Sequence, residues 1–195
     1  IHIKTKLQSY YKPTSLSAVF SHRRQHPNAV IVCGATDIAL RVTKNHELLR
    51  EIIDLSDVAE LKAINDSPAG LTIGGGVTLN DAMPRIEHDF PALYKMLSVF
   101  GSQQIRNLAT FGGNLGSASP VGDALPVLMA YGAKVVLKRA NGKRAVSLDD
   151  YFLGYRKTAR AANELITAIV IPKLKSGAAV RSYKVSKRKD LDIST

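Results

Sequence analysis

A glycine-rich stretch with few large side chains, residues 109–123, constrains this chain more than any other. It contains Gly112, Gly113, Gly116 and Gly122 among small hydroxylated residues, and it has no lysine or arginine. Because glycine lacks a Cβ, a ligand can lie against its main chain, and successive exposed amides form a concavity that binds anions. The stretch therefore suits the phosphates of a nucleotide, although a purely structural glycine-rich loop would have the same composition. Further hydrogen bonds to a ligand are available from the side chains of Thr110, Asn114, Ser117 and Ser119.

A second turn of small residues, at positions 34–37, follows a continuous β-branched run at 29–33. Such a run is typical of a strand that is buried on both faces, and α/β folds place ligand phosphates where a buried strand ends. The turn is not a Walker loop, since no Gly-Lys-Ser/Thr follows it. Gly34 also lacks the partner glycines of the dinucleotide fingerprint. Taken alone, this turn is a weak indication of a phosphate site.

The cysteine content and the hydropathy pattern exclude several classes of protein. Cys33 is the only cysteine, so the chain can form no internal disulfide and cannot hold a cysteine-ligated iron–sulfur cluster. We expect Cys33 to be a buried strand cysteine rather than a reactive thiol. No apolar run approaches the roughly 20 residues that span a bilayer, and the N-terminus lacks a secretion signal. These features predict a cytoplasmic protein without a membrane partner.

The chain is strongly basic, with 27 Lys and Arg against 16 Asp and Glu and a formal net charge of +11. This charge raises the hypothesis of a basic nucleic-acid-binding module. Many of the basic residues, however, lie in the short segment after Pro172, which has Tyr183 as its only aromatic residue and so offers no stacking platform. We therefore expect no nucleic-acid partner and interpret the charge as a solvated face or a local site for an anionic ligand or acidic partner.

Periodicity and turn residues predict the order of the secondary structure. We expect strands at 29–33, 51–55, 60–64, 71–73, 134–138, 143–146, 163–172 and 179–185. Helices are expected to begin after Ser15 and around Thr78, and another at 124–130 to end at Gly132. The dipeptide Asn141-Gly142 predicts a hairpin turn. The first third of the chain therefore has a parallel α/β pattern, and the remainder is mainly antiparallel strands with helices.

The two small-residue turns and a later segment together resemble the flavin-binding domain of the xanthine dehydrogenase and molybdenum hydroxylase family. The family's first loop is close to Ala-Gly-Gly-Thr-Asp, and this chain has Cys33-Gly34-Ala35-Thr36-Asp37. The second loop, Thr-x-Gly-Gly-Asn followed by Ala-Ser-Pro-x-x-Asp, corresponds to 110–114 and 118–123. Residues 104–107 and 152–157 also fit, so the resemblance runs from about Pro13 to the C-terminus. Ala35 departs from the family pattern, where glycine is common.

This resemblance implies an α+β fold. It consists of two α/β subdomains of the FAD-binding PCMH/vanillyl-alcohol-oxidase type, the first with a small parallel sheet and the second mainly antiparallel. The cofactor lies in a cleft between them. The expected segments are a lead-in at 1–12, a first FAD-binding subdomain at 13–70, a second at 71–178, and the start of a truncated C-terminal subdomain at 179–195.

The same resemblance implies a set of cofactor-binding residues, with no catalytic side chain and no metal ligand. Asp123 would accept hydrogen bonds from ribityl or adenosine hydroxyls, and Lys184 would supply positive charge to a phosphate or to the flavin. A helix cap and a solvated lysine are their structural alternatives. Carried over by position, the FAD-binding residues are Val32, Cys33, Gly34, Ala35, Thr36, Asp37, Ile38, Phe100, Thr110, Phe111, Gly112, Gly113, Asn114, Asp123, Ile166 and Lys184.

The function implied is that of an FAD-dependent oxidoreductase subunit of the xanthine dehydrogenase type. Electrons would arrive from 2Fe-2S clusters on an iron–sulfur domain and leave FAD for NAD⁺, while molybdopterin would belong to a molybdenum-binding subunit. Residues 186–192 resemble the family's mobile loop near the flavin. One alternative is a flavoprotein subunit of a carbon monoxide dehydrogenase-like or other hydroxylase with a different acceptor. Another is an assembly subunit that keeps the fold without the cofactor.

Overall fold

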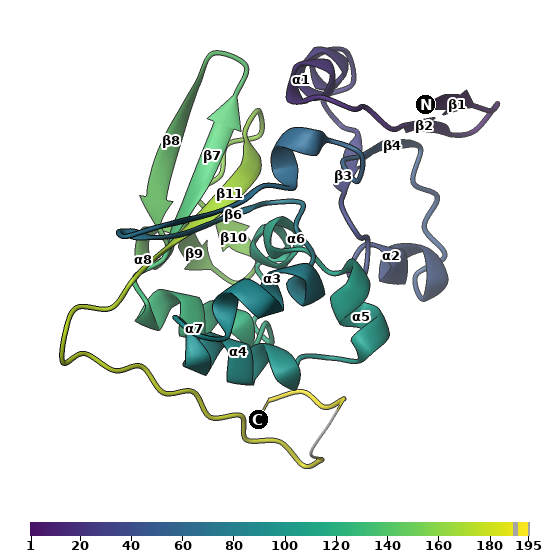
Figure 1. Cartoon of the computed structure of the whole chain (residues 1–195). Coiled ribbons are helices and arrows are strands. Elements are labelled where there is room, and N and C mark those ends of the chain that lie inside the picture. Colours follow the sequence, from purple (N-terminus) through teal and green to yellow (C-terminus); the bar gives the residue numbers. More distant parts are fainter. Residues whose placement is uncertain (189–190, 195) are drawn as a thin grey trace.

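The structure is a computed structural model that describes residues 1–188 and 191–194, and its chain folds into two lobes (Figure 1). Each lobe has its own sheet and its own cluster of buried hydrophobic residues. The smaller cluster lies under the first sheet, and the larger one lies between the second sheet and its helices. This arrangement confirms the expected α+β fold class.

The first lobe is built on a four-stranded sheet in the order β1-β2-β4-β3. Strands β2, β4 and β3 are parallel, with β3 at one edge, and β1 adds an antiparallel strand at the other edge. The chain that was expected to be a lead-in therefore supplies two strands of this sheet. The elements of the lobe are β1 (His2–Lys4), β2 (Ser9–Tyr11), α1 (Leu16–Gln25), β3 (Val30–Val32), α2 (Ala39–Thr43), β4 (Glu51–Asp54) and η1 (Ala59–Leu61).

Helix α1 begins where its sequence predicts. The Ser15 hydroxyl accepts a hydrogen bond from the amide of Ala18, which satisfies one of the free donors of the first turn. Leu16 and Val19 are buried one turn apart and face the small core. The helix ends at His26, whose amide donates to the carbonyl of His22.

The second lobe contains a five-stranded antiparallel sheet in the order β5-β6-β11-β7-β8. Figure 1 shows helices α3, α4 and α7 stacked below this sheet, with α6 between them and the strands. Helix α6 contacts β11 and β6 directly. The larger elements are β5 (Ile64–Ser67), β6 (Gly70–Gly74), α3 (Leu79–Ile86), α4 (Pro91–Ser98), α6 (Phe111–Ser117), α7 (Ala124–Ala130), β7 (Lys134–Arg139), β8 (Gly142–Ser147) and β11 (Leu165–Pro172).

Shorter elements connect these layers. They are α5 (Gln103–Leu108), α8 (Leu148–Tyr151), and a small ribbon of β9 (Phe152–Gly154) and β10 (Lys157–Thr158). The predicted cap at Thr78 is present, since its hydroxyl accepts from the amide of Asp81. The predicted hairpin is also present, with β7 and β8 joined through Gly142 at φ 149°. No helix in the part of the chain described here is long and apolar enough to cross a membrane.

Two of the expected strands, at 60–64 and at 179–185, are not formed as predicted. Residues 60–64 are not one strand, because the amide of Lys62 bonds back to Ala59 in a 3₁₀ turn that buries Leu61, and β5 begins only at Ile64. β5 then pairs with β6 in the second sheet, although it lies within the range 13–70. Residues 179–185 form no strand. They run extended beneath α4 and α7 (Figure 1), where the Ser182 hydroxyl donates to the carbonyl of Ala92.

The glycine-rich stretch contains helix α6 rather than one long loop. Thr110 caps this helix by accepting from the amide of Gly113, and Phe111 and Leu115 are buried four residues apart. A Cβ on Gly112 would lie 2.5 Å from the carbonyl oxygen of Gly75, so the helix needs glycine there to approach β6. Burial of two large apolar residues and a good cap outweigh the low helix propensity of glycine.

The best-satisfied buried charge in this fold is the carboxylate of Glu164, which lies just before β11. It accepts from Arg144 Nε at 2.7 Å, from Arg144 Nη2 at 2.8 Å and from the amide of Ala161 at 2.8 Å. The hydrogen bonds from Arg144 lower the pKa of Glu164 to about 2. A carboxyl with a depressed folded-state pKa stabilises the fold above its unfolded pKa, and that contribution is lost as pH falls toward the folded value.

We therefore expect Glu164→Gln to lower the free energy of unfolding by about 2 kcal/mol near neutral pH, and by less at about pH 3. Urea denaturation at both pH values measures the difference. Glu87→Gln is the control, because Glu87 is exposed and should change stability by no more than about 0.5 kcal/mol. A Glu164→Gln deficit that is the same at both pH values would contradict this account.

Candidate functional site

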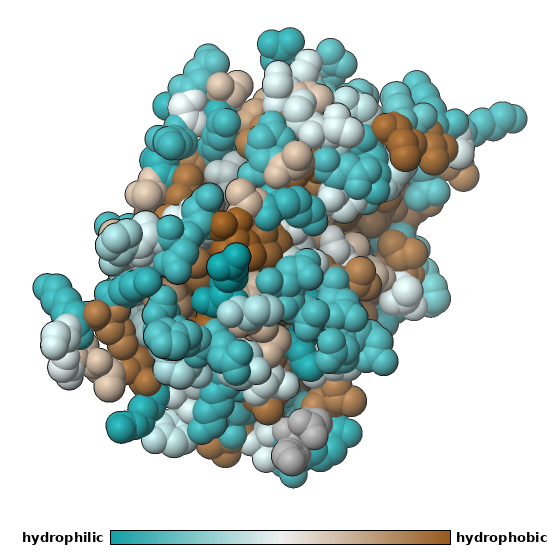
Figure 2. Space-filling view, viewed as in Figure 1, coloured by the Kyte–Doolittle hydropathy of each residue, from teal (hydrophilic) through white to brown (hydrophobic). Residues whose placement is uncertain are grey.

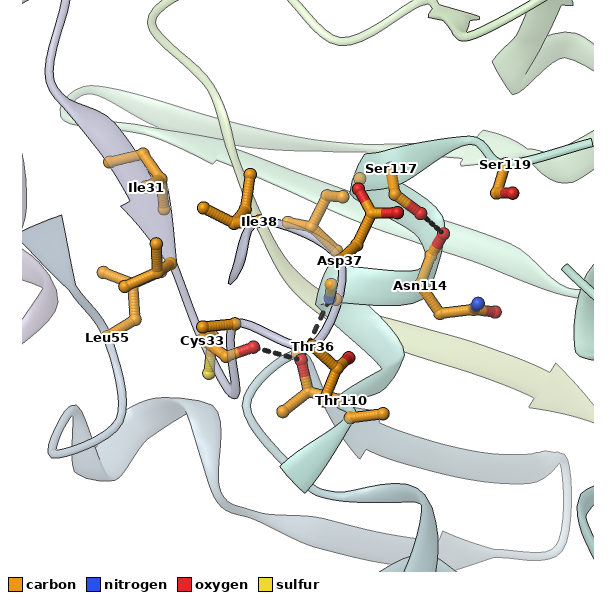
Figure 3. Close-up of a pocket in the computed structure, with 18 of the residues that line it drawn as sticks. Ile31, Cys33, Thr36, Asp37, Ile38, Leu55, Thr110, Asn114, Ser117 and Ser119 are labelled. Atoms are coloured by element: carbon orange, nitrogen blue, oxygen red, sulfur yellow. Dashed lines mark hydrogen bonds between the residues drawn. The ribbon is translucent and has the colours of Figure 1, made fainter. Parts of the chain in front are cut away.

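A cavity of about 380 Å³ lies where the two lobes meet, and both small-residue turns line it. The first lobe contributes the end of β3 and the turn after it, and the second contributes the α5–α6 junction and helix α6. In Figure 3, Ile31 and Leu55 lie at one end, Thr36 and Thr110 near the middle, and Ser119 at the other end. Turns that are far apart in the sequence thus share one pocket.

The first turn is held against the second lobe by a close backbone contact. Gly34 and Ala35 have φ angles of 76° and 54°, so both adopt the left-handed conformation. A Cβ on Gly34 would lie 1.8 Å from the carbonyl oxygen of Leu108, which leaves room for glycine alone. The hydroxyl of Thr110 donates to the carbonyl of Cys33 at 3.4 Å and joins the same two segments.

The first turn also presents unused hydrogen-bond donors. Within the part of the chain that the structure describes, the amides of residues 34–38 donate to no acceptor, and α2 begins only with the bond from Ala39 to Ala35. Because unpaired backbone amides are costly when shielded from water, a run of them facing a pocket suits an anion. Residues 35–38 all line the cavity.

The second turn differs from the first, because its backbone amides already donate hydrogen bonds within the protein. Those of Phe111 and Gly112 donate to the carbonyls of Val77 and Gly75, and the amide of Gly113 donates to the Thr110 hydroxyl. What the second turn offers is an unpaired acceptor. Asn114 Oδ1 is buried and lacks a hydrogen-bond partner among the described residues, and Asn114 lines the cavity. An orphaned buried polar atom of this kind costs about 1–3 kcal/mol unless a ligand satisfies it.

The pocket wall is largely apolar and carries few charges. Ile31 and Leu55 lie together at one end in Figure 3, and Leu165, Phe100 and Val121 are further apolar lining residues. Such apolar surfaces suit the ring systems of a ligand. The donors of the first turn, the orphaned acceptor and the apolar wall therefore fit a dinucleotide such as FAD.

Arg160 and Asp37 are the charged residues that line this pocket. Arg160 was not predicted from the sequence, because no motif surrounds it and only the fold brings it beside β11. Cys33 lies in the pocket wall, and burial raises the pKa of its thiol, which keeps it neutral. This is the behaviour expected of a structural cysteine.

Most of the cofactor-binding residues predicted from the sequence line this one cavity. Those that do so are Val32, Cys33, Ala35, Thr36, Asp37, Ile38, Phe100, Thr110, Gly112, Gly113, Asn114 and Ile166. Gly34 lies behind the turn, against Leu108. Phe111 is 1% exposed and belongs to the core of the second lobe. Lining residues that sequence reasoning missed include Ile31, Leu55, Ile105, Val121 and Arg160.

Asp123 and Lys184 lie beside the cavity and contact each other. Lys184 Nζ is 2.7 Å from Asp123 Oδ2, and the two side chains are 7% and 9% exposed. Lys184 also donates to the carbonyl of Val99, next to the pocket residue Phe100. Their predicted contact with the cofactor stays a prediction. Of the segment 186–192, Lys189 and Asp190 lie outside the described residues, and the amide of Arg188 donates to Asp192.

Comparison with known proteins agrees with this fold. Residues 4–174 match the family described as the FAD binding domain in molybdopterin dehydrogenase, so the chain belongs to that family. It is 32% identical over 197 residues to xanthine dehydrogenase/oxidase of Gallus gallus, covering 95% of this chain and 14% of that protein. It is 34% identical over 178 residues to the nicotinate dehydrogenase FAD-subunit of Eubacterium barkeri, covering 89% of this chain and 60% of that protein.

Solved structures share the same fold. Quinoline 2-oxidoreductase from Pseudomonas putida 86 superposes with a TM-score of 0.86 at 27% identity, over 97% of this chain and 67% of that chain. Carbon monoxide dehydrogenase from Hydrogenophaga pseudoflava superposes with a TM-score of 0.89 at 24% identity, over 98% of this chain and 67% of that chain. The curated relatives named above extend well beyond the part that this chain matches.

The contact at Gly34 can be tested against a matched glycine. Gly34 and Gly177 have similar φ angles, 76° and 80°, but a Cβ on Gly177 would meet nothing within 4 Å. Both alanine variants therefore carry the same backbone strain, and only Gly34→Ala adds a clash with Leu108. We expect Gly34→Ala to lower the free energy of unfolding by about 2 kcal/mol more than Gly177→Ala in urea denaturation. Equal losses would show that the turn does not pack against the second lobe.

Proposed function

We propose that this chain is the FAD-binding electron-transfer unit of a molybdenum hydroxylase of the xanthine dehydrogenase type. The observation that carries the proposal is the convergence of two turns on one pocket, with free amides at 34–38 on one side and the unpaired Asn114 Oδ1 on the other. Membership of the FAD-binding family supports the choice of cofactor.

Different residues along the pocket would bind different parts of the cofactor. The amides of residues 35–38 would bind the diphosphate, since backbone donors can neutralise an anion without a cationic side chain. Asn114 Oδ1 accepts a hydrogen bond from a hydroxyl or ring N–H of the ligand. The apolar side chains of Ile31 and Leu55 would hold the adenosine, and Phe100 would contact the flavin.

Asp123 and Lys184 complete the flavin end in this proposal. Their ion pair holds the wall near Phe100 and Gly122, because Asp123 directly follows Gly122 and Lys184 bonds to Val99. A carboxylate and an ammonium there are placed to meet ribityl hydroxyls and negative charge on the cofactor. Bound FAD supplies the two-electron redox chemistry, and the chain supplies position and electrostatics.

The rest of the enzyme would come from other domains or subunits. We propose that an iron–sulfur domain with 2Fe-2S clusters delivers electrons to FAD, and that a molybdenum-binding subunit carries molybdopterin and the hydroxylation substrate. The electron acceptor in this proposal is NAD⁺, as the resemblance to xanthine dehydrogenases implies. A cytoplasmic location stays a prediction from the sequence.

FAD binding by the parent chain and by Asn114→Ala tests the cofactor assignment. Asn114→Ala removes the hydrogen bond that Asn114 Oδ1 would accept from FAD. We expect this loss to weaken FAD binding about tenfold, which corresponds to about 1.4 kcal/mol. Asn65→Ala is the control, since Asn65 is exposed on β5, away from the pocket. Quenching of flavin fluorescence reports binding, and the chain contains no tryptophan to interfere. A parent chain that binds no FAD would overturn the proposal.

The acceptor is tested on the same FAD-loaded chain. NADH added without oxygen should bleach the visible flavin absorption, because hydride transfer between FAD and the nicotinamide is reversible in principle. An FAD-loaded chain that NADH leaves coloured, but that a chemical reductant bleaches, would reject NAD⁺ and favour a different acceptor.

A further inference from the structure

A second, larger hollow lies between the lobes and shares no lining residue with the FAD pocket. This basic groove has a volume of about 930 Å³ and runs between helix α1 of the first lobe and the turn of the β7–β8 hairpin of the second. Figure 2 shows hydrophilic side chains over both elements. The groove is lined by Leu16, Ser17, Phe20, Ser21, Arg23, Arg24, Pro27, Lys138, Arg139, Ala140, Asn141, Ala162 and Asn163.

The charges in the basic groove have one sign. Arg23 and Arg24 stand on the α1 wall, Lys138 and Arg139 stand on the hairpin wall, and no Asp or Glu lines the groove. The side chains of Arg24 and Lys138 form no hydrogen bond or ion pair with any described residue. Walls of like charge facing each other repel, and an anionic occupant would remove that cost.

The hydrogen-bond donors of Arg23 are only partly satisfied by the protein. Its Nε and Nη2 both donate to the carbonyl of Ala162, at 3.2 and 2.6 Å, and so bridge the two lobes. Its Nη1 is buried without an acceptor among the described residues. Burial and the nearby Arg160 lower the pKa of Arg23, so the guanidinium lies in a region that already carries excess positive charge.

The groove also has free polar groups and an apolar floor. The side chains of Ser17, Ser21, Asn141 and Asn163 form no hydrogen bond with described residues, and all of them are exposed. Between them lie Leu16, which is buried, and Phe20, which is half-buried. Hydroxyl and amide side chains can pair with the main chain of an extended polypeptide, and the floor can receive its apolar side chains.

We propose that the basic groove binds an acidic segment of a partner polypeptide, with its carboxylates between the α1 wall and the hairpin wall. The segment would join the two lobes at a point away from the FAD pocket. A second copy of this chain is a poor occupant, because its net charge is also +11. Phosphate ligands are less suited, because the cations are spread along two walls and Phe20 is the only aromatic side chain in the groove.

The test uses a fluorescein-labelled decapeptide of alternating glutamate and glycine, with its glutamine counterpart as the uncharged probe. Fluorescence anisotropy at about 0.1 M salt compares the parent chain with the double variant Arg24→Glu/Lys138→Glu. The matched control is Arg85→Glu/Lys134→Glu, which makes the same change in net charge at exposed positions outside the groove. Thermal melting checks that all of these chains are folded.

We expect the groove variant to bind the acidic peptide about tenfold more weakly than the parent, and the control variant to differ by less than about twofold. If the groove variant melts early, Arg24→Gln/Lys138→Gln replaces it and should still weaken binding more than the corresponding glutamine control. Equal losses in groove and control variants, or equal binding of the glutamine peptide, would overturn the proposal. So would tighter, groove-dependent binding of oligothymidylate or inorganic pyrophosphate.

Discussion

The shape of the pocket depends on a close backbone contact between the lobes, where the turn at Gly34 meets the carbonyl of Leu108. A side chain at Gly34 would overlap that carbonyl, so the turn can pack there only as glycine. The hydroxyl of Thr110 reinforces the contact by bonding to Cys33. Because the cavity lies directly beside this junction, its shape follows from how closely the two backbones approach.

Glycine has two different uses around this site. In the first turn it permits a left-handed conformation, and the amides of 34–38 are left without partners. In helix α6 it permits close packing instead, since Gly112 lies against Gly75 and its amide is consumed by that carbonyl. The two turns thus make complementary contributions, with donors from the first and the acceptor of Asn114 from the second. Composition alone cannot distinguish these uses, because both require only the absence of a Cβ.

Much of the fold and about half of the pocket wall could be predicted from the sequence, because local signals agree with the tertiary structure there. The β-branched run before Gly34, the cap at Thr78 and the Asn141-Gly142 turn all act over a few residues. The predictions fail where contacts between residues distant in the sequence determine the local structure or the position of a side chain. The segment 60–64 turns because Leu61 is buried in the small core. Arg160 lies between β10 and β11 and lines the pocket only because the fold places that segment there, which no local pattern indicates.

The central claim is that the free amides of residues 34–38 hold the diphosphate of FAD. Hydrogen–deuterium exchange of the chain with and without FAD tests it most directly, with residues 175–178 as an exposed internal reference. The amides of 34–38 should exchange rapidly in the free chain and become protected when FAD is added, while those of the reference stay unchanged. FAD that binds without slowing exchange at 34–38 would contradict the account.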